Sequence, residues 1–355
     1  MLLIVAHHYV TSSGLTLADG PIFADPLSWR SVFLLLIGAW GKTGINCFML
    51  ITGYYMCRSR LTAKKYAKLL LEVVFYRVVI AGIFFLSGKE PFSFTGLLMA
   101  VLPITEVSTN FTGAFLCFYL CIPFCNALVH SLSERQHIRL LLVSCFIYVF
   151  FGTVKILPVT MNYVSWFIVL YFIASYVRLY PKTIFASKWV WVWATVVSLT
   201  VSMLSVLACT WLGARIGRNS PYAFVADSNT FLALATGFSS FMLFKNIKIP
   251  TSRVINTVAS TTFGVLLIHG NAFVRRWLWG EVVHCVETYD HKLMPLFVLG
   301  GTVAVFAACA AMDLCRQYLV ERPVFRLWDK LWPRAQERWK ILEEKICRKC
   351  HISAE

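Results

Sequence analysis

Two adjacent histidines near the start of the chain could carry out acid–base chemistry. The sequence begins MLLIVAHHYV, so His7 and His8 end a short apolar run. An imidazole titrates near neutral pH and can therefore remove a proton from an attacking hydroxyl. A structural interpretation stays open, in which both rings are hydrogen-bonded near the outer end of an apolar helix and take no part in chemistry.

Further ionisable side chains lie inside apolar runs, where each is costly unless it meets a partner or a cavity. They are Lys42, Glu72, Arg77, His269 and Asp313. His269 either lines a cavity or joins two packed helices, and Lys42 either lines a cavity or extends to the interface from a glycine-containing helix. Glu72 and Arg77 are poorly spaced for a mutual ion pair, so we expect their partners on other helices. Asp313 is expected to pair with Arg316.

A dense group of cations, here called the basic cluster, follows the second apolar run. Its members are Arg58, Arg60, Lys64, Lys65 and Lys68. In one interpretation these residues only mark the cytoplasmic side of a membrane. In the other, they bind the phosphates of a nucleotide-bearing donor.

No other chemical motif competes with the histidines. The sequence has no nucleophile elbow, zinc-ligand spacing or glycine-rich phosphate loop. Most of the 12 cysteines lie in apolar runs, where they behave as small hydrophobes, and they form no disulfide framework. The string Cys347-Arg-Lys-Cys350-His351 matches a haem-attachment spacing, but we expect no fold around it. We therefore expect no metal and no tightly bound cofactor.

Apolar segments must position these residues. The chain is 58% hydrophobic and 14% charged, far less charged than soluble domains. The apolar runs fall at about 1–10, 32–57, 68–87, 112–129, 138–156, 162–179, 188–212, 229–244, 256–278 and 293–319. Segments of this length cross a bilayer as helices, because a helix satisfies its own backbone. The sequence predicts an all-α, polytopic membrane protein with about ten transmembrane helices, and a short re-entrant or interfacial stretch at 92–104.

The charge distribution predicts the orientation. The formal net charge is +16, but no basic domain stands outside the membrane, so we exclude nucleic acid as a partner. Most Lys and Arg residues lie in alternate loops and in the tail, which predicts that both termini are cytoplasmic. We expect a transmembrane domain at 1–320 and a basic tail at 321–355. The tail's tryptophans at helical spacings predict an amphipathic helix on anionic membrane lipids.

Six short segments, in order along the chain, resemble those of the family 3 membrane acyltransferases. They are LLIVAHH (2–8), GKTGINCFMLITGYYM (41–56), LTAKKYAKLLLEVVFY (61–76), YVSWFIVLYFIASYVRLYP (163–181), TTFGVLLIH (261–269) and ERP (321–323). The family histidine falls on His8. The Trp-Phe-x-x-x-Tyr pattern falls on Trp166 and Tyr171, and the arginine after it is Arg178.

The resemblance implies an O-acyltransferase of the bacterial cytoplasmic membrane. Such proteins commonly move acetyl from acetyl-CoA to hydroxyls of cell-surface saccharides or lipid-linked glycans. It implies that His8, with His7 beside it, is the catalytic base, and that Lys42, Asn46 or an arginine stabilises the oxyanion. It further implies that the basic cluster holds the CoA phosphates. We expect the remaining donor or substrate contacts from Glu72, Arg77, Trp166, Tyr171, Arg178 and His269.

The chain departs from the family pattern at a few places, and two alternatives stay open. The usual Arg-containing segment before the histidine motif is missing from the sequence, Leu266 replaces an aromatic residue, and Gly270 stands where an acidic residue is common. The first run is also about half the length needed to cross. One alternative is a truncated, inactive paralogue. The other is a transporter or flippase of an acylated or anionic solute, with Lys42 and Arg77 in its cavity; the lack of an inverted repeat argues mildly against it.

Overall fold

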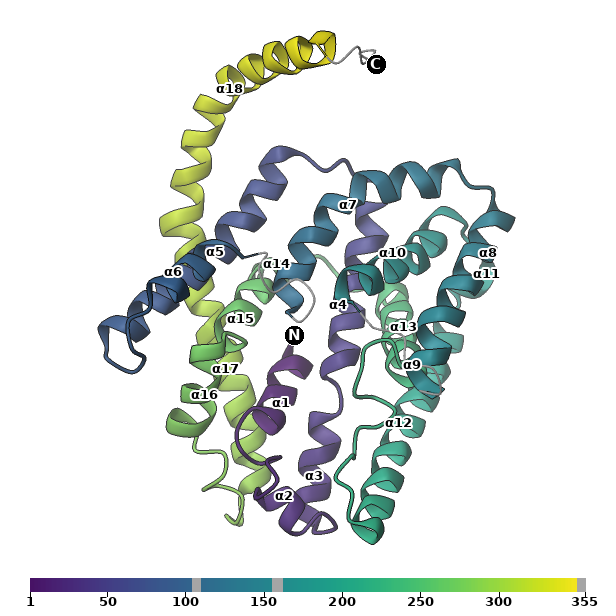
Figure 1. The fold of residues 1–355 in the computed structure, drawn as a ribbon. Helices are drawn as coiled ribbons and strands as arrows, with labels where there is room; N and C mark the ends of the chain where they lie inside the picture. The colour runs from purple at the N-terminus through teal and green to yellow at the C-terminus, as the bar shows by residue number, and fades with distance from the viewer. Residues whose placement is uncertain (104–109, 155–161, 350–355) are drawn as a thin grey trace.

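The computed structural model describes residues 1–103, 110–154 and 162–349, and within them the chain is helical with no β-strand (Figure 1). The first part forms α1 (Leu2–Thr11), α2 (Pro21–Ala24), α3 (Trp29–Gly38), α4 (Gly41–Met56), α5 (Ala63–Leu86) and α6 (Phe94–Val101). The middle part forms α7 (Phe111–Ser131), α8 (Glu134–Cys145), the π-helical η1 (Phe146–Phe150), α9 (Phe151–Val154), α10 (Tyr163–Leu179), α11 (Thr183–Ala186) and α12 (Lys188–Ile216). The last part forms α13 (Phe231–Asn246), α14 (Arg253–Ser260), α15 (Thr262–His269), α16 (Ala272–Trp277), η2 (Leu278–Val282), α17 (Met294–Arg316), η3 (Gln317–Glu321) and α18 (Arg322–Lys349). The predicted all-α class is confirmed.

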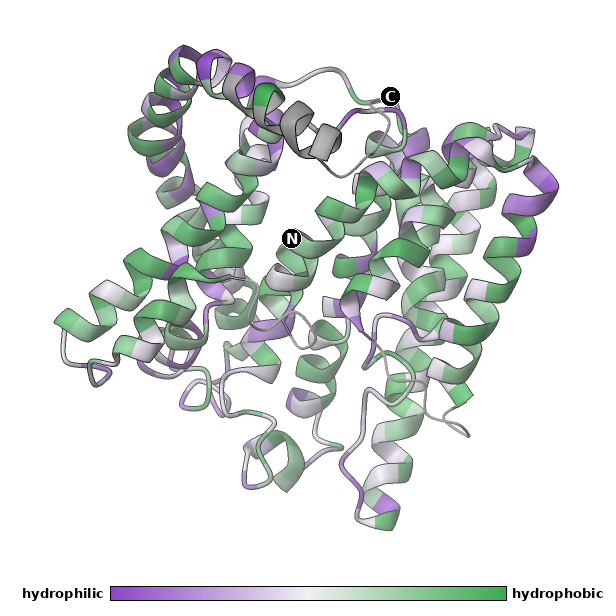
Figure 2. Cartoon of the chain, turned by 45° about the horizontal axis from the view of Figure 1, so that its top comes forward, coloured by the Kyte–Doolittle hydropathy of each residue, from purple (hydrophilic) through white to green (hydrophobic). Residues whose placement is uncertain are grey.

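Each predicted apolar run coincides with a helix or with consecutive helices, but the predicted count of ten membrane crossings is not confirmed. In the described residues, six helical segments are long and apolar enough to cross a membrane. A seventh is the broken pair Arg253–His269 and Ala272–Val282, whose two parts meet at an angle of 77°. Helices α1 and α10 are apolar but shorter. Figure 2 shows hydrophobic residues along most of the helices and hydrophilic ones on the loops and α18.

Asparagines fix where several helices begin inside the bundle. The side chain of Asn110 accepts a hydrogen bond from the backbone N–H of Thr112, and that of Asn271 accepts one from Phe273. Such N-caps satisfy backbone donors that a helix start leaves unpaired. They therefore fix where α7 and α16 begin.

Small residues let α4 pack tightly at the centre. A Cβ added at Gly44 would lie 2.8 Å from a side-chain atom of Ile4 in α1, and one added at Gly53 would lie 3.0 Å from Ala174 in α10. Both distances are shorter than ordinary carbon contacts. These glycines therefore allow a close approach between helices, which places α1 directly against α4.

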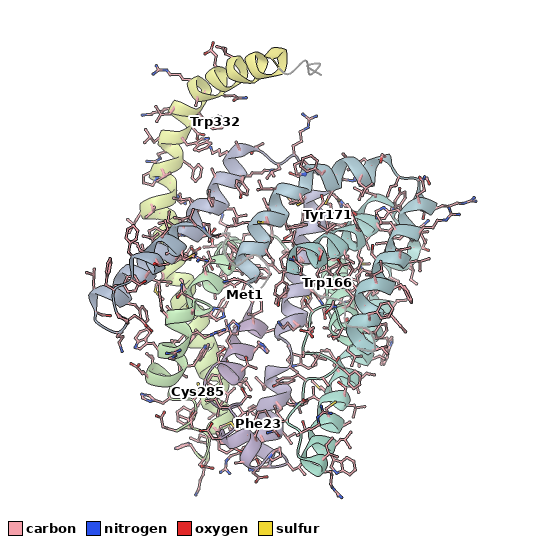
Figure 3. All side chains as sticks on the ribbon, viewed as in Figure 1. Met1, Phe23, Trp166, Tyr171, Cys285 and Trp332 are labelled. Atoms are coloured by element: carbon pink, nitrogen blue, oxygen red, sulfur yellow. The ribbon has the colours of Figure 1, made fainter. Side chains whose placement is uncertain are left out.

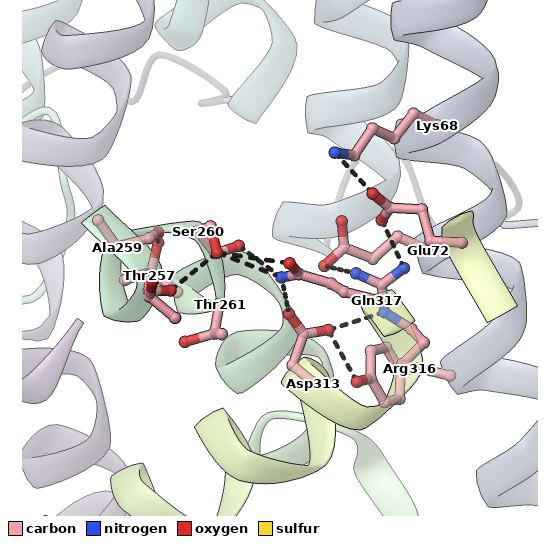
Figure 4. A network of polar contacts seen from close by, with 12 residues as sticks. Lys68, Glu72, Thr257, Ala259, Ser260, Thr261, Asp313, Arg316 and Gln317 are labelled. Carbon is pink, nitrogen blue, oxygen red and sulfur yellow. Dashed lines mark hydrogen bonds and ion pairs between the residues drawn. The ribbon is translucent and has the colours of Figure 1, made fainter. Parts of the chain in front are cut away.

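A buried ion cluster joins α5 to the end of α17 (Figure 4). The Arg316 guanidinium lies 3.2 Å from Glu72, 2.7 Å from Asp313 and 2.9 Å from Glu321. Lys68 also contacts Glu321, at 2.7 Å. The structure therefore confirms the predicted Asp313–Arg316 pair and shows that the partner of Glu72 lies on another helix.

The C-terminal helix α18 continues from α17 and projects beyond the bundle (Figure 1). Its rings of Trp328 and Trp332 stack with their centroids 4.5 Å apart, and its Asp329 accepts from Lys64 at 2.6 Å. Figure 3 places Trp332 at one end of the molecule and Phe23 and Cys285 at the other, with Met1 between them. Cys350 and His351 of the haem-like string lie outside the described residues.

Candidate functional site

A cavity of about 660 Å³ lies where α1, α4, α5, α7 and α15–α16 meet. His7 and His8 of α1 line it, together with Lys42 of α4 and Arg77 of α5. The cavity is therefore placed beside both histidines that the sequence marks as a possible acid–base pair. Its other lining residues include Asn110, Phe111, Thr112, Tyr163, Asn271 and Arg275.

The backbone of α3 holds His7 in place. Its Nδ1 lies 2.6 Å from the carbonyl oxygen of Gly38. A carbonyl only accepts hydrogen bonds, so Nδ1 carries the hydrogen and Nε2 of the neutral ring keeps a lone pair. Gly41 lies directly against this ring, and a Cβ there would occupy the place of its atoms. The turn between α3 and α4 thus fixes the orientation of His7.

His8 lies between two other histidine rings. Its ring centroid is 5.7 Å from that of His7 and 5.1 Å from that of His269. His269 ends α15, is fully buried, and brings its ring to His8 because α15 stops at the bend before α16. The structure therefore brings His269 to the adjacent histidines His7 and His8, from which it is far apart in the sequence.

Cations from three helices line the same cavity. The Lys42 ammonium donates to the Tyr163 hydroxyl at 2.9 Å, and the Arg77 guanidinium donates to the backbone oxygen of Met99 at 2.8 Å. Arg275 of α16 is a further lining cation. A cavity with this lining favours a ligand that is anionic or that develops negative charge as it reacts.

Three of the predicted site residues lie in the packed interior and do not line the cavity. Asn46 donates to the carbonyl of Ser228 at 2.7 Å and accepts from Trp166 at 3.1 Å, so both ends of its amide are already used. Tyr171 is fully buried and donates to Asn126. Their contacts join α4, α7 and α10 to one another.

The basic cluster lies away from the cavity lining, at the end of the molecule that carries α18. Lys64 and Lys68 pair with Asp329 and Glu321. Lys65 donates to the Ser59 hydroxyl and the Arg60 carbonyl. Among the residues that the structure describes, Arg58, Arg60 and Lys65 have no carboxylate partner.

Two further predicted site residues also contact the protein itself. Arg178 donates to the Tyr54 hydroxyl at 2.9 Å and lies over its ring. Glu72 belongs to the buried ion cluster of Arg316. Neither residue lines the cavity, and both contact other parts of the protein.

The sequence reasoning missed Tyr163, Asn110, Asn271 and Arg275 as lining residues. Asn110 and Asn271 carry a local signal, because each is a polar residue directly before an apolar helix, as an N-cap is. Arg275 falls near the end of the apolar run 256–278, and it lines the cavity because the chain bends before α16. Within the described ranges, no group of three or more His, Cys, Asp or Glu side chains is placed to hold a metal ion.

Comparison with known proteins matches the chain to a protein family. The family model described as an acyltransferase domain, of the acyltransferase 3 type, matches residues 1–314. No curated protein and no solved structure matches the chain. The matched range includes all of the cavity lining and favours group transfer over transport.

Proposed function

Because the chain belongs to the family 3 membrane acyltransferases, we propose that it transfers acetyl from acetyl-CoA to a hydroxyl of a cell-surface saccharide. The acceptor is a free saccharide or a lipid-linked glycan, and the enzyme acts in the cytoplasmic membrane of a bacterium. The observation that carries this proposal is the cavity in which His7, His8 and Lys42 meet inside the helical bundle.

The proposed reaction uses His8 as the general base. The acceptor oxygen attacks the thioester carbonyl carbon while His8 takes the hydroxyl proton. The carbonyl oxygen then becomes negative, and the nearby Lys42 ammonium stabilises it. When the carbon–sulfur bond breaks, the ester is formed and the CoA thiolate recovers the proton from the His8 imidazolium. His7 is the second candidate for the base, since its Nε2 also keeps a lone pair.

The basic cluster is the proposed site for the CoA phosphates. The long pantetheine arm separates these phosphates from the thioester, so their site has to lie at a distance from His8. Arg58, Arg60 and Lys65 are the members best suited to this role, because Lys64 and Lys68 are already paired with carboxylates. Arginine and lysine bind phosphate through charge-assisted hydrogen bonds.

The proposal is tested by substituting single histidines. Membranes are prepared from cells that express the His8→Ala, His7→Ala or His130→Ala variant. They are incubated with acetyl-CoA labelled in the acetyl group and with surface polysaccharide from the expressing cells, and the label transferred to the polysaccharide is measured. His130 is an exposed control whose ring makes a hydrogen bond to the Asn126 carbonyl of its own helix. We expect His8→Ala to lower transfer by about 10²-fold or more, the range that general base catalysis supplies. Unchanged transfer in this variant would contradict the assignment of His8 as the base. If only His7→Ala shows the loss, His7 is the base instead.

A further inference from the structure

The rings of His8 and His269 each carry a buried nitrogen without a partner. Nδ1 of His8 and Nε2 of His269 are both shielded from solvent and make no hydrogen bond. An unpaired buried polar atom destabilises the fold, and such atoms are rare in folded proteins. These two belong to neighbouring rings whose centroids are 5.1 Å apart. Each is therefore the natural partner of the other.

The hydrogen on His269 can be located from its one hydrogen bond. Its Nδ1 lies 2.5 Å from the carbonyl oxygen of Val265, which can only accept. Nδ1 therefore carries the hydrogen. A neutral imidazole has a single N–H, so Nε2 of His269 holds a lone pair and needs a donor.

The same reasoning then sets the hydrogen on His8. If Nδ1 of His8 supplies the donor that His269 needs, then Nε2 of His8 holds the lone pair. His8 lines the cavity, and its Nε2 is not among the buried unpartnered atoms. The lone pair thus belongs to the nitrogen on the cavity side, where a base has to be.

We propose that His269 is a positioning residue: its Nε2 accepts the His8 Nδ1–H and holds His8 in the tautomer whose Nε2 faces the cavity. This proposal rests on the proposed function, in which His8 is the base. The structure shows no bond between these two nitrogens, but the ring centroids are 5.1 Å apart, close enough for a direct N–H···N bond once the nitrogens face each other. Contacts of this kind commonly tighten once substrate is bound. The hydrogen-bond relay from Val265 through His269 would hold the ring and tautomer of His8, as the orienting carboxylate holds the histidine of a catalytic triad.

A purely structural role for His269 makes a different prediction. Among the described residues its side chain makes one hydrogen bond, to Val265 four residues earlier in the same helix, so it forms no hydrogen bond to a second helix. An asparagine at 269 has its amide at the position of Nδ1 and can keep that bond, but it cannot reach His8. A glutamine extends one bond further and can present its oxygen near the place of Nε2. The two variants therefore separate the two roles.

The test compares His269→Gln with His269→Asn in the full-length protein. Purified enzyme in detergent receives labelled acetyl-CoA and surface polysaccharide from the expressing cells, and kcat and KM for acetyl-CoA are measured. We expect Gln to stay within a few-fold of the parent kcat and Asn to lose about 10²-fold, both with unchanged KM. Thermal unfolding of both variants controls for folding.

Two results would overturn the proposal. One is an Asn variant as active as the parent; the other is an equal loss in both variants. Either result leaves the proposed function standing if His8→Ala is still inactive. If His8→Ala retains full transfer, the proposed base itself has failed, whatever the residue 269 variants show.

Discussion

Lys42 is a cation that the fold holds at the cavity through a neutral partner. Its ammonium donates one hydrogen bond to Tyr163, and its other hydrogens can be donated to an oxyanion. We expect Lys42→Met to lower kcat for acetyl transfer by about 10²-fold, as removal of one oxyanion donor does elsewhere. Initial rates at saturating acetyl-CoA measure the effect.

The matched control for Lys42 is Tyr163→Phe. This change removes the hydroxyl that Lys42 contacts but keeps the ring beneath the ammonium. We expect a smaller loss of kcat than for Lys42→Met. If Lys42→Met instead raises KM and leaves kcat unchanged, the ammonium binds the ground state and does not stabilise the oxyanion.

Gly41 is a residue at which a single methyl group should disturb the site. A Cβ at this position would occupy the space of the His7 ring. We expect Gly41→Ala to displace His7 from Gly38 and to lower acetyl transfer. Gly82→Ala in α5 is the control, since no atom lies within 4 Å of its added Cβ. That variant should keep full activity and gain up to about 1 kcal/mol in helix stability. Equal activity in both variants would contradict the role of the close contact.

Residue chemistry could be predicted from the sequence only where it depends on local spacing. The Asp313–Arg316 pair follows from positions three apart on one helix. The contact between His8 and His269 could not be predicted in this way, because it depends on the bend between α15 and α16. Asn46 is a second case. The resemblance makes it a candidate oxyanion donor, and only the fold shows that Trp166 and Ser228 contact both ends of its amide.

At the scale of elements, the Arg316 cluster holds α5 to the junction of α17 and α18. Three carboxylates surround its guanidinium, which is almost fully buried. Removing one partner of a buried ion pair costs about 3–5 kcal/mol, because the remaining charges stay buried. We therefore expect Arg316→Met to lower the unfolding temperature in detergent markedly. Lys89→Ala breaks the exposed pair with Glu281 and should cost at most about 1 kcal/mol. Similar unfolding temperatures for both variants would show that the cluster adds no stability.

Helix positions were largely predictable and helix breaks were not. Apolar runs report burial or lipid contact over many residues, so their positions match the helices. Breaks depend on single caps and on packing. Asn271 caps α16 and permits the 77° bend, and nothing in the apolar pattern of 256–278 marks it. The bend is nevertheless what places both His269 and Arg275 at the site.

At the scale of the whole molecule, the basic residues gather towards one end. The basic cluster, the loop before α8 and the helix α18 lie at the end marked by Trp332, whereas Cys285 and Phe23 lie at the opposite end (Figure 3). Lys and Arg are retained on the cytoplasmic side during insertion. The end that carries α18 is therefore predicted to be cytoplasmic, which lets acetyl-CoA reach the basic cluster from inside the cell.

Reporter fusions at two positions test this orientation. Green fluorescent protein fused after Ser133 should fluoresce, because that loop is predicted to be cytoplasmic. Alkaline phosphatase fused after Glu287 should be active, because that loop is predicted to lie outside. Exchanging the two reporters should silence both. If the exchanged pair is the active one, the basic cluster faces outward and CoA cannot reach it. The donor site would then have to be sought at the end that carries Cys285, while the roles of His8 and His269 would need a donor arriving from that side.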